Sequence, residues 1–333
     1  MQLQRNSNIE LLRVIIMFMI LLLHANIKTF GWPEENNTVT LLRIVAESIN
    51  IIAVNVFVLI SGYYGVSFRI YKIVDLCFRI VFTVFTITML FYAFGLYKSG
   101  SIKELVHGFY FWNYWFCNAY IVLLVLSPLL NLAVERLNRA QFKYILIILF
   151  VIFSIVQGDL FITPPGVGVN GGCSTLWFLF LYMLGRYISI NPPVFKIKKY
   201  IWMYLCGLFG TVVLMWKFHN FSYNNPFITL QSVSFFLLFL HLDCKSRLIN
   251  TIASSSLMVY LLHGHPLIFQ NYYCETIKCL YTKFDQGVGF IVSVFAFCIM
   301  VYFIAILFDQ LRKFIWSLFE SRIKKFDKIV LFN

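Results

Sequence analysis

Residues 11–24 read LLRVIIMFMILLLH, an apolar stretch with an arginine near its start and a histidine at its end. The apolar run that contains it, roughly 9–29, is long enough to cross a bilayer as one helix of about 20 residues. Polar groups are costly in hydrocarbon, so those that persist usually line a cavity or pair with one another. Eleven residues at about 100° each place Arg13 and His24 on the same helix face, roughly 16 Å apart along the axis. The stretch therefore predicts a membrane helix with two aligned polar side chains.

The composition of the whole chain extends this prediction. The 333 residues are 60% hydrophobic and only 12% charged, whereas a soluble domain has about a quarter charged residues. Ten apolar runs are candidate spans: 9–29, 43–63, 73–96, 112–133, 142–158, 174–190, 199–216, 226–242, 252–271 and 287–311. They are too long and continuous for barrel strands, which alternate in polarity over about ten residues. We therefore expect an all-α, polytopic membrane helix bundle of about ten helices and a single domain, 1–333.

The distribution of basic residues predicts the topology. With the N-terminus in the cytoplasm, ten spans return the C-terminus to the cytoplasm, and 18 of the 27 Lys and Arg residues fall on that side. Seven fall outside, at Lys28, Arg43, Lys98, Lys103, Lys217, Lys278 and Lys283, and the remaining two, Arg13 and Arg79, lie within the inner ends of helices. Short cytoplasmic loops carry such an excess, so we interpret the net charge of +13 as topology and expect no nucleic-acid partner. The basic tail 319–333 is expected to contact anionic lipids of the inner leaflet.

The first apolar run and the cysteines do not change this predicted topology. No small-residue cleavage site follows the first apolar run, so we interpret it as a retained helix rather than a signal peptide. Most of the eight cysteines fall inside predicted spans, where a thiol is a small apolar filler. Cys274 and Cys279 share a predicted external loop, and free thiols are the favoured state there. The expected location is the plasma membrane, with multiple passes.

One layer of the predicted bundle, in its outer half, is rich in groups able to bind a polyol and move a proton. It contains His24, and the segments FWNYWFCNAY, GGCSTLWFLFLY and SSSLMVYLLHGHPLIF bring further polar groups to the same level. These groups are Glu47, Asn50, Trp115, Asn118, Ser174, Thr175, Trp177, His263 and His265. No metal is expected, because two histidines two residues apart on a helix point about 200° from each other.

The predicted cytoplasmic half of the bundle contains different groups, mainly cations and small residues. Arg13, Lys72 and Arg79 supply positive charge there, and the segment FVLISGYYG at the end of the second span offers Ser61 and Gly62 where backbone could approach an anion. The simpler interpretation of the glycines is a helix end followed by a turn. The positive-inside rule alone also explains Lys72 and Arg79.

These residues resemble the integral-membrane acyltransferase-3 family along nearly the whole chain. The segments that carry the resemblance are NIELLRVIIMFMILLLH, FVLISGYYG, WFCNAYIVLLVLSPLLN, LWFLFLYMLGRYI and SSLMVYLLHGHPL. The first has the family's arginine and histidine separated by ten residues, and the second has its F-x-x-x-S-G-[FY] signature. The family's R-x-x-R pair is only approximated, by Arg69-x-x-Lys72 or by Lys72 with Arg79.

The resemblance implies transfer of an acyl group from cytoplasmic acyl-CoA, acetyl-CoA by default, to a sugar hydroxyl of an envelope polysaccharide or lipid-linked intermediate. It implies that Arg13, Ser61, Gly62, Lys72 and Arg79 bind the donor. His24 is then the general base, with an acyl-histidine as the less favoured alternative. The candidate oxyanion donors are His263, Ser174 or a Trp indole N–H.

The remaining outer groups would contact the acceptor, namely Glu47, Trp115, Asn118, Ser174, Trp177 and His265. Glu47 could instead orient His24, although a solvated helix end is the favoured interpretation of this carboxylate. The alternative function is a polysaccharide flippase, polymerase or other envelope transporter without acyl transfer. Such proteins need a polar central pathway, a large external loop or acidic groups at mid-membrane. The acidic residue nearest to this requirement is Asp75, which is predicted near an inner helix end.

Overall fold

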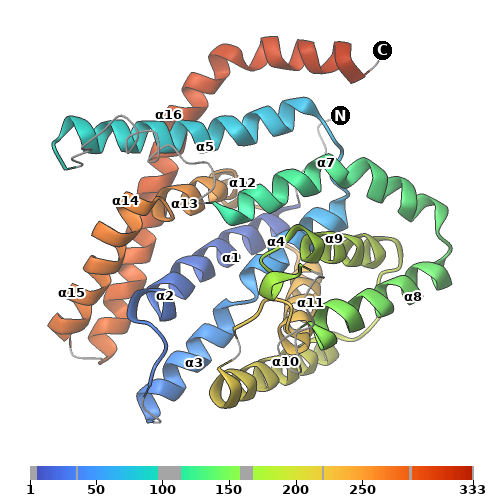
Figure 1. Ribbon diagram of the computed structural model, residues 1–333, viewed down its shortest axis with the longest axis horizontal. Coiled ribbons are helices and arrows are strands. Elements are labelled where there is room, and N and C mark those ends of the chain that lie inside the picture. The colour runs from blue at the N-terminus through green and yellow to red at the C-terminus, as the bar shows by residue number, and fades with distance from the viewer. Residues whose placement is uncertain are drawn as a thin grey trace. The chain divides into compact units, whose positions relative to one another are not determined.

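The computed structural model describes residues 6–34, 37–96, 114–157, 168–219, 221–284 and 287–331, with side chains in the last range described through residue 325. Regular structure in these ranges is helical, and none of the described residues forms a strand (Figure 1). The predicted all-α class is therefore confirmed. The start of predicted span 112–133, the end of 142–158 and the lysines Lys98 and Lys103 lie outside the described residues.

Helices occupy the positions of all ten predicted spans. Their bounds are α1 Ser7–Ala25, α2 Ile27–Phe30, α3 Thr38–Asn50, α4 Ala53–Tyr64, α5 Ile70–Ala93, α7 Trp115–Arg136, α8 Arg139–Phe150, α9 Thr175–Ile190, α10 Ile197–Phe218, α11 Pro226–Leu240, α12 Arg247–Ala253, α13 Ser256–His263, α14 Pro266–Ile268, α15 Glu275–Phe284 and α16 Val288–Leu331. Within the described chain, seven helical segments are long and apolar enough to span a membrane, or eight if one bent pair is a single span. Helices α9 and α11, with 16 and 15 residues, are shorter. The chain is a multi-pass membrane protein, while the count of ten spans and the cytoplasmic termini remain predictions.

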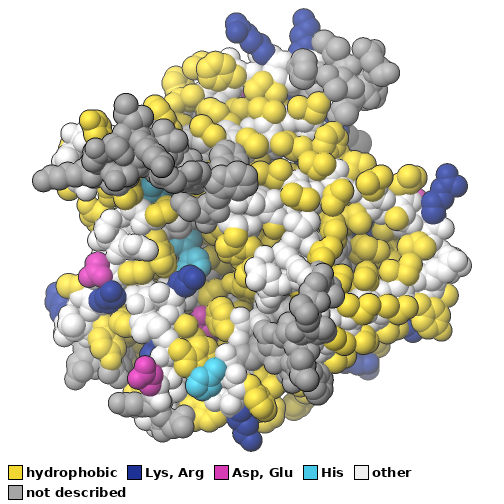
Figure 2. All heavy atoms as spheres, viewed as in Figure 1, with side chains coloured by type: hydrophobic (Ala, Val, Ile, Leu, Met, Phe, Trp, Pro, Cys, Tyr) yellow, Lys and Arg dark blue, Asp and Glu magenta, His cyan; other side chains and the backbone are white. Residues whose placement is uncertain are grey.

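Helix α16 shows why the fold suits a lipid environment. Its inward stripe contains Cys298, Tyr302, Ala305, Asp309 and Arg312, all buried, at spacings of three or four residues. Its exposed stripe is made of large apolar side chains: Val292, Phe295, Ile299, Phe303, Leu307, Leu311, Phe314 and Leu318. Figure 2 shows hydrophobic side chains over much of the visible face. A helix that buries charge and exposes apolar groups reverses the pattern of a soluble surface helix, so we interpret this stripe as lipid-facing.

The C-terminal helix is longer than the predicted span 287–311. Helix α16 continues to Leu331 without interruption, because residues 312–331 contain neither glycine nor proline to end it. The basic tail predicted to contact the inner leaflet is therefore helical through Leu331, and its lipid contact remains a prediction.

The chain folds as two compact units, Met1–Ser67 with Ala119–Ala253, and Phe68–Asn118 with Ser254–Asn333. In the first unit, α4 packs against α9 through paired glycines. A Cβ atom placed on Gly62 would lie 2.2 Å from the carbonyl oxygen of Tyr182, and one on Gly185 would lie 2.5 Å from that of Leu59. Small residues allow such backbone contact between membrane helices. Gly62 therefore lies inside a helix and serves packing, whereas Gly65, at φ +67°, ends α4 as expected for the turn.

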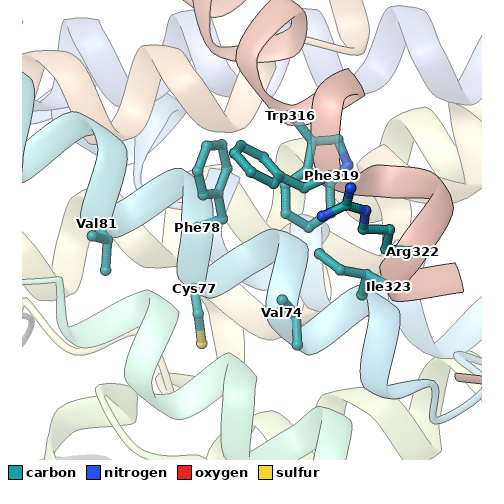
Figure 3. A pocket seen from close by; sticks show the side chains of 8 residues that line it. All are labelled: Val74, Cys77, Phe78, Val81, Trp316, Phe319, Arg322 and Ile323. Carbon is teal, nitrogen blue, oxygen red and sulfur yellow. The ribbon is translucent and has the colours of Figure 1, made fainter. Parts of the chain in front are cut away.

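In the second unit, α13 and α5 pack against α16. A groove of about 470 Å³ lies between α5 and α16 (Figure 3). Its lining is Val74, Cys77, Phe78, Val81, Trp316, Phe319, Arg322 and Ile323. Apart from Arg322 these side chains offer only apolar surface and a thiol, which suits lipid chains better than a polar substrate.

The predicted span 252–271 is broken rather than continuous. Helix α13 ends at His263, and the next helical segment, Pro266–Phe284, is bent by 69° from it. Pro266 causes this break, because proline has no N–H to donate and clashes with the preceding turn of a helix. The segment predicted as an external loop is helical: Cys274 ends the π-helical segment Phe269–Cys274, and Cys279 lies in α15. None of the eight cysteines forms a disulfide.

The glycine contact gives a first prediction. Gly62→Ala should lower the melting temperature of the purified protein in detergent, because its methyl group overlaps the Tyr182 backbone and overpacking of this kind costs about 1–3 kcal/mol. Ile190→Ala, on the exposed side of α9, is the control and should change stability by less than about 0.5 kcal/mol. Equal melting temperatures for the two variants would contradict the close α4–α9 contact.

Candidate functional site

Helix α1 holds the first two candidate residues on one continuous element. Asn6 caps its N-terminus by accepting from the backbone N–H of Asn8, and the helix runs unbroken from Ser7 to Ala25. Arg13 and His24 therefore keep the eleven-residue separation, roughly 16 Å along the axis. Both side chains are partly buried.

The charge of Arg13 is balanced within its own helix. Its Nη1 donates to Oε1 of Glu10 at 2.9 Å, and the Glu10 side chain is almost fully buried while that of Arg13 is 34% exposed. The sequence analysis did not single out Glu10, although its spacing of three residues from Arg13 is typical of ion pairs on one helix face. The guanidinium is thus oriented by a buried carboxylate and keeps part of its surface free for an anion.

The other end of α1 meets a buried polar cluster formed by Asn26, Arg43 and Glu47. The Asn26 amide donates to Oε2 of Glu47 at 2.8 Å and to the Arg43 carbonyl at 2.8 Å, and Nε of Arg43 donates back to Asn26 at 3.1 Å. Glu47 is 1% exposed, so the favoured interpretation of a solvated helix end is wrong. The buried Glu47 carboxyl group has hydrogen-bond partners in Asn26 and the backbone of Ile27, which both donate to it.

Ser174 and Trp177 lie at the start of α9. Ser174 caps the helix by accepting from the backbone N–H of Trp177 at 3.3 Å, and the buried Trp177 indole N–H donates to Oδ1 of Asn55 at 3.0 Å. The Asn55 amide in turn donates to the carbonyl of Tyr223 at 2.8 Å. Trp177 and Ser174 thus already have structural partners, and Asn55, which the sequence analysis missed, joins α4 to α9 and to the loop before α11.

Ser61 lies one residue before the packing glycine of α4. Its hydroxyl donates to the carbonyl of Phe57 at 3.1 Å and lies 3.0 Å from the hydroxyl of Tyr120. Hydroxyls that bond to the i−4 carbonyl are satisfied inside the membrane without water. Ser61 keeps a polar group near the C-terminal end of α4, beside the turn at Gly65.

In the second unit, the helix break positions two buried imidazoles. The Nδ1 of His263 lies 2.6 Å from the carbonyl of Val259, so Nδ1 carries the proton of the neutral ring and Nε2 is an acceptor. The Nδ1 of His265 instead accepts from the backbone N–H of Leu267 at 3.3 Å, which leaves the proton on Nε2. That buried Nε2 has no hydrogen-bond partner in the described part of the chain.

The two rings therefore offer opposite chemistry, one as a base and one as an N–H donor. Because Gly264 follows the end of α13 and His265 begins the next helical segment, the estimate of 200° for a continuous helix does not apply to them. No group of three or more metal-ligating side chains occurs within the described ranges.

Trp115 and Asn118 lie in the first turn of α7 and are partly buried. Beside them, the buried hydroxyl of Tyr114 donates to the carbonyl of Leu261 at 2.7 Å and fixes this turn on α13. The sequence analysis missed Tyr114, whose aromatic character gave no signal in a chain that is 19% aromatic.

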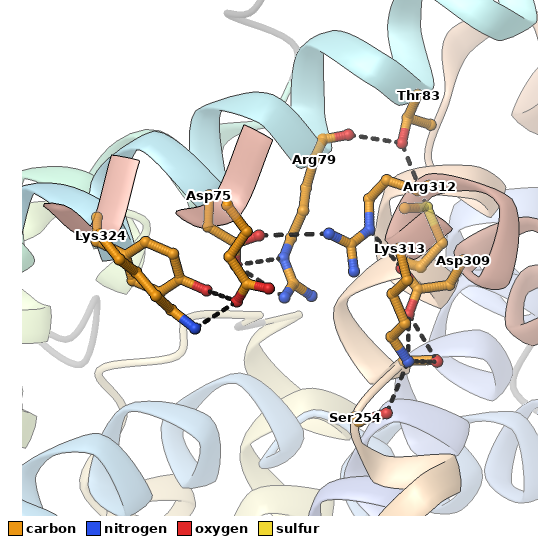
Figure 4. Close-up of polar contacts among 12 residues, drawn as sticks. Asp75, Arg79, Thr83, Ser254, Asp309, Arg312, Lys313 and Lys324 are labelled. Carbon is orange, nitrogen blue, oxygen red and sulfur yellow. Dashed lines mark hydrogen bonds and ion pairs between the residues drawn. The ribbon is translucent and has the colours of Figure 1, made fainter. Parts of the chain in front are cut away.

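Arg79 belongs to a buried ion network. Its guanidinium binds Asp75 at 2.8 Å, Arg312 binds both Asp75 at 3.3 Å and Asp309 at 2.6 Å, and Lys313 binds Asp309 at 3.0 Å (Figure 4). Lys313 also donates to Ser254 and Ser255. Arg79 is thus held in part by structural contacts, whereas Lys72, on the same helix, is exposed.

These features describe a helical membrane protein in which buried ionisable groups such as Glu47, Asp309 and Arg312 have hydrogen-bond partners. A family model described as an acyltransferase domain matches residues 6–310. The chain therefore belongs to the acyltransferase-3 family and is a membrane acyltransferase. No curated protein and no solved structure matches it.

The ion network gives a second prediction. Arg312→Met should destabilise the purified protein by about 3–5 kcal/mol, because it leaves the fully buried Asp309 carboxylate without its closest cation. The control is Lys278→Met, which breaks the exposed pair with Glu275 and should cost less than about 1 kcal/mol. Similar thermal stabilities of the two variants would show that the network does not support the second unit.

Proposed function

We propose that this chain transfers an acyl group, acetyl in the simplest case, from cytoplasmic acyl-CoA to a hydroxyl of a cell-envelope or capsular polysaccharide sugar. The observation that supports it is the continuity of α1, which fixes Arg13 and His24 on one face, roughly 16 Å apart. The phosphates of CoA cannot enter hydrocarbon, but its slender pantetheine arm can lie between helices. A separation of this size suits that arm, with Arg13 near the nucleotide end and His24 near the thioester.

His24 acts as the general base in this proposal. A sugar hydroxyl is a weak nucleophile near neutral pH, and an imidazole can remove its proton as the oxygen attacks the thioester carbonyl. The tetrahedral intermediate then collapses, the carbon–sulfur bond breaks, and the imidazolium returns its proton to the leaving CoA thiolate. Catalysis of this kind typically contributes about 10²–10⁴ in rate.

The cluster at the end of α1 supports the base by holding the backbone around it. The hydroxyl of Thr29 donates to the carbonyl of His24 at 2.7 Å, and the Asn26–Glu47 bond ties the next residues to α3. We assign Glu47 and Asn26 a positioning role and expect the acceptor to bind near Ser174, which belongs to the same unit. The oxyanion role of His263 and His265, in the second unit, stays a prediction from the sequence; of the two rings, His265 has its N–H on Nε2.

A third prediction tests the base. His24→Ala should abolish acetyl transfer from acetyl-CoA to the envelope glycan and leave melting temperature and membrane insertion unchanged. Acetate released by mild alkali from purified glycan measures the transfer. His219→Ala, at the exposed end of α10, is the matched control and should keep full acetylation; normal acetate release from the His24→Ala strain would remove His24 from the mechanism.

A fourth prediction tests the donor end. Arg13→Ala should raise the KM for acetyl-CoA about tenfold or more, because a charge-assisted contact to phosphate is lost, and should leave the KM for the acceptor nearly unchanged. Steady-state release of the CoA thiol by the purified protein measures both constants. An equal rise in both constants would argue against a nucleotide-end role.

A further inference from the structure

Arg186, in the last turns of α9, lies directly over the turn that ends α4. Gly65 occupies this turn at φ +67°, a conformation that favours glycine. A Cβ atom at position 65 would lie 2.7 Å from Nη1 of Arg186 and 3.1 Å from its Cζ. The glycine therefore leaves the space that the guanidinium fills, and all of these atoms belong to the first unit.

None of the described residues forms a hydrogen bond or an ion pair with the Arg186 guanidinium. Its Nε is buried without a hydrogen bond, and none of its nitrogens forms an ion pair within the described ranges. Neither α4 nor α9 contains an aspartate or a glutamate. Arg13, by contrast, has Glu10, and Arg79 has Asp75. Because a partly buried arginine without an acceptor is costly, the site is incomplete without an anion.

The surrounding polar groups hold the turn in place and leave the guanidinium unengaged. The Tyr182 hydroxyl donates to Oδ1 of Asn131 at 2.7 Å, and the Asn131 amide donates to the carbonyl of Val66 at 3.1 Å. Arg13 and its ion-pair partner Glu10 both lie within electrostatic range of the Tyr64 hydroxyl. Of the two arginines near the SGYYG segment, Arg13 thus has a carboxylate partner, whereas Arg186 forms no ion pair with the described residues.

We propose that Arg186 binds a phosphate group at this turn and that the phosphate belongs to the acyl donor. This inference rests on the proposed function and extends it, since Arg186 would be a donor-binding residue beyond Arg13. The planar guanidinium presents two parallel N–H donors to phosphate oxygens. The phosphate of an anionic lipid has the same chemistry, so the experiment must separate the two sources.

The test is the affinity of the detergent-purified full chain for CoA, measured by calorimetry. Arg186→Gln should weaken CoA binding about tenfold or more. Arg186→Lys should weaken it less, because lysine keeps the positive charge but lacks the two parallel N–H donors of the guanidinium. Arg136→Gln, which removes an exposed charge near the end of α7, should bind CoA as the wild type does. Melting temperatures of all variants check that each is folded.

Repeating the titration with dephospho-CoA locates the contact. If the Arg186→Gln effect disappears, Arg186 binds the ribose phosphate; if it persists, Arg186 binds the pyrophosphate, and both outcomes support the proposal. Unchanged CoA affinity in Arg186→Gln, together with loss of the stabilisation given by phosphatidylglycerol over phosphatidylcholine nanodiscs, would assign the site to a lipid headgroup and overturn it. A wild-type chain that binds no CoA would instead refute the proposed function itself.

Discussion

The absence of water from the hydrocarbon core is the constraint on which this structure depends. A polar group placed there must find its partner inside the protein or cost several kcal/mol. The chain meets this demand in each unit separately, with the Asn26–Glu47–Arg43 cluster and the Asn55–Trp177 bond in one and the Asp75–Arg312–Asp309 network in the other. Six buried side-chain atoms in the described ranges lack a hydrogen bond, and two of them, Nε of Arg186 and Nε2 of His265, belong to ionisable groups.

Whether a buried polar group has a partner inside the fold separates structural groups from functional candidates. Trp177 and Arg79 each resembled ligand contacts in the sequence, but their partners in the fold explain why they can be buried. Arg13 has features of both groups, because Glu10 orients its guanidinium while part of its surface remains exposed. Family membership establishes acyl transfer as the chemistry, and the proposals for donor and acceptor follow from the groups that the fold leaves available.

The sequence predicted the helices well because hydrophobic length is a direct physical requirement of a membrane span. It also placed Arg13 and His24 on one face, since helix periodicity needs no tertiary information. It failed at 263–266, where Pro266 broke a span treated as continuous, and it treated Glu47 as solvated although the partner that buries it, Asn26, lies on a different helical segment. No sequence pattern singled out Arg186. Its unpaired nitrogen depends on where α4 and α9 meet, and no local pattern carries that information.

In the proposed arrangement, α1 lies along the donor, with the nucleotide end at Arg13 and the thioester at His24. Labelling with a membrane-impermeant maleimide tests this arrangement, in a variant free of native cysteines that carries either Arg13→Cys or His24→Cys. Position 24 should react in intact cells, and position 13 should react only after the membrane is opened. Reaction at position 24 from the cytoplasmic side alone would contradict it.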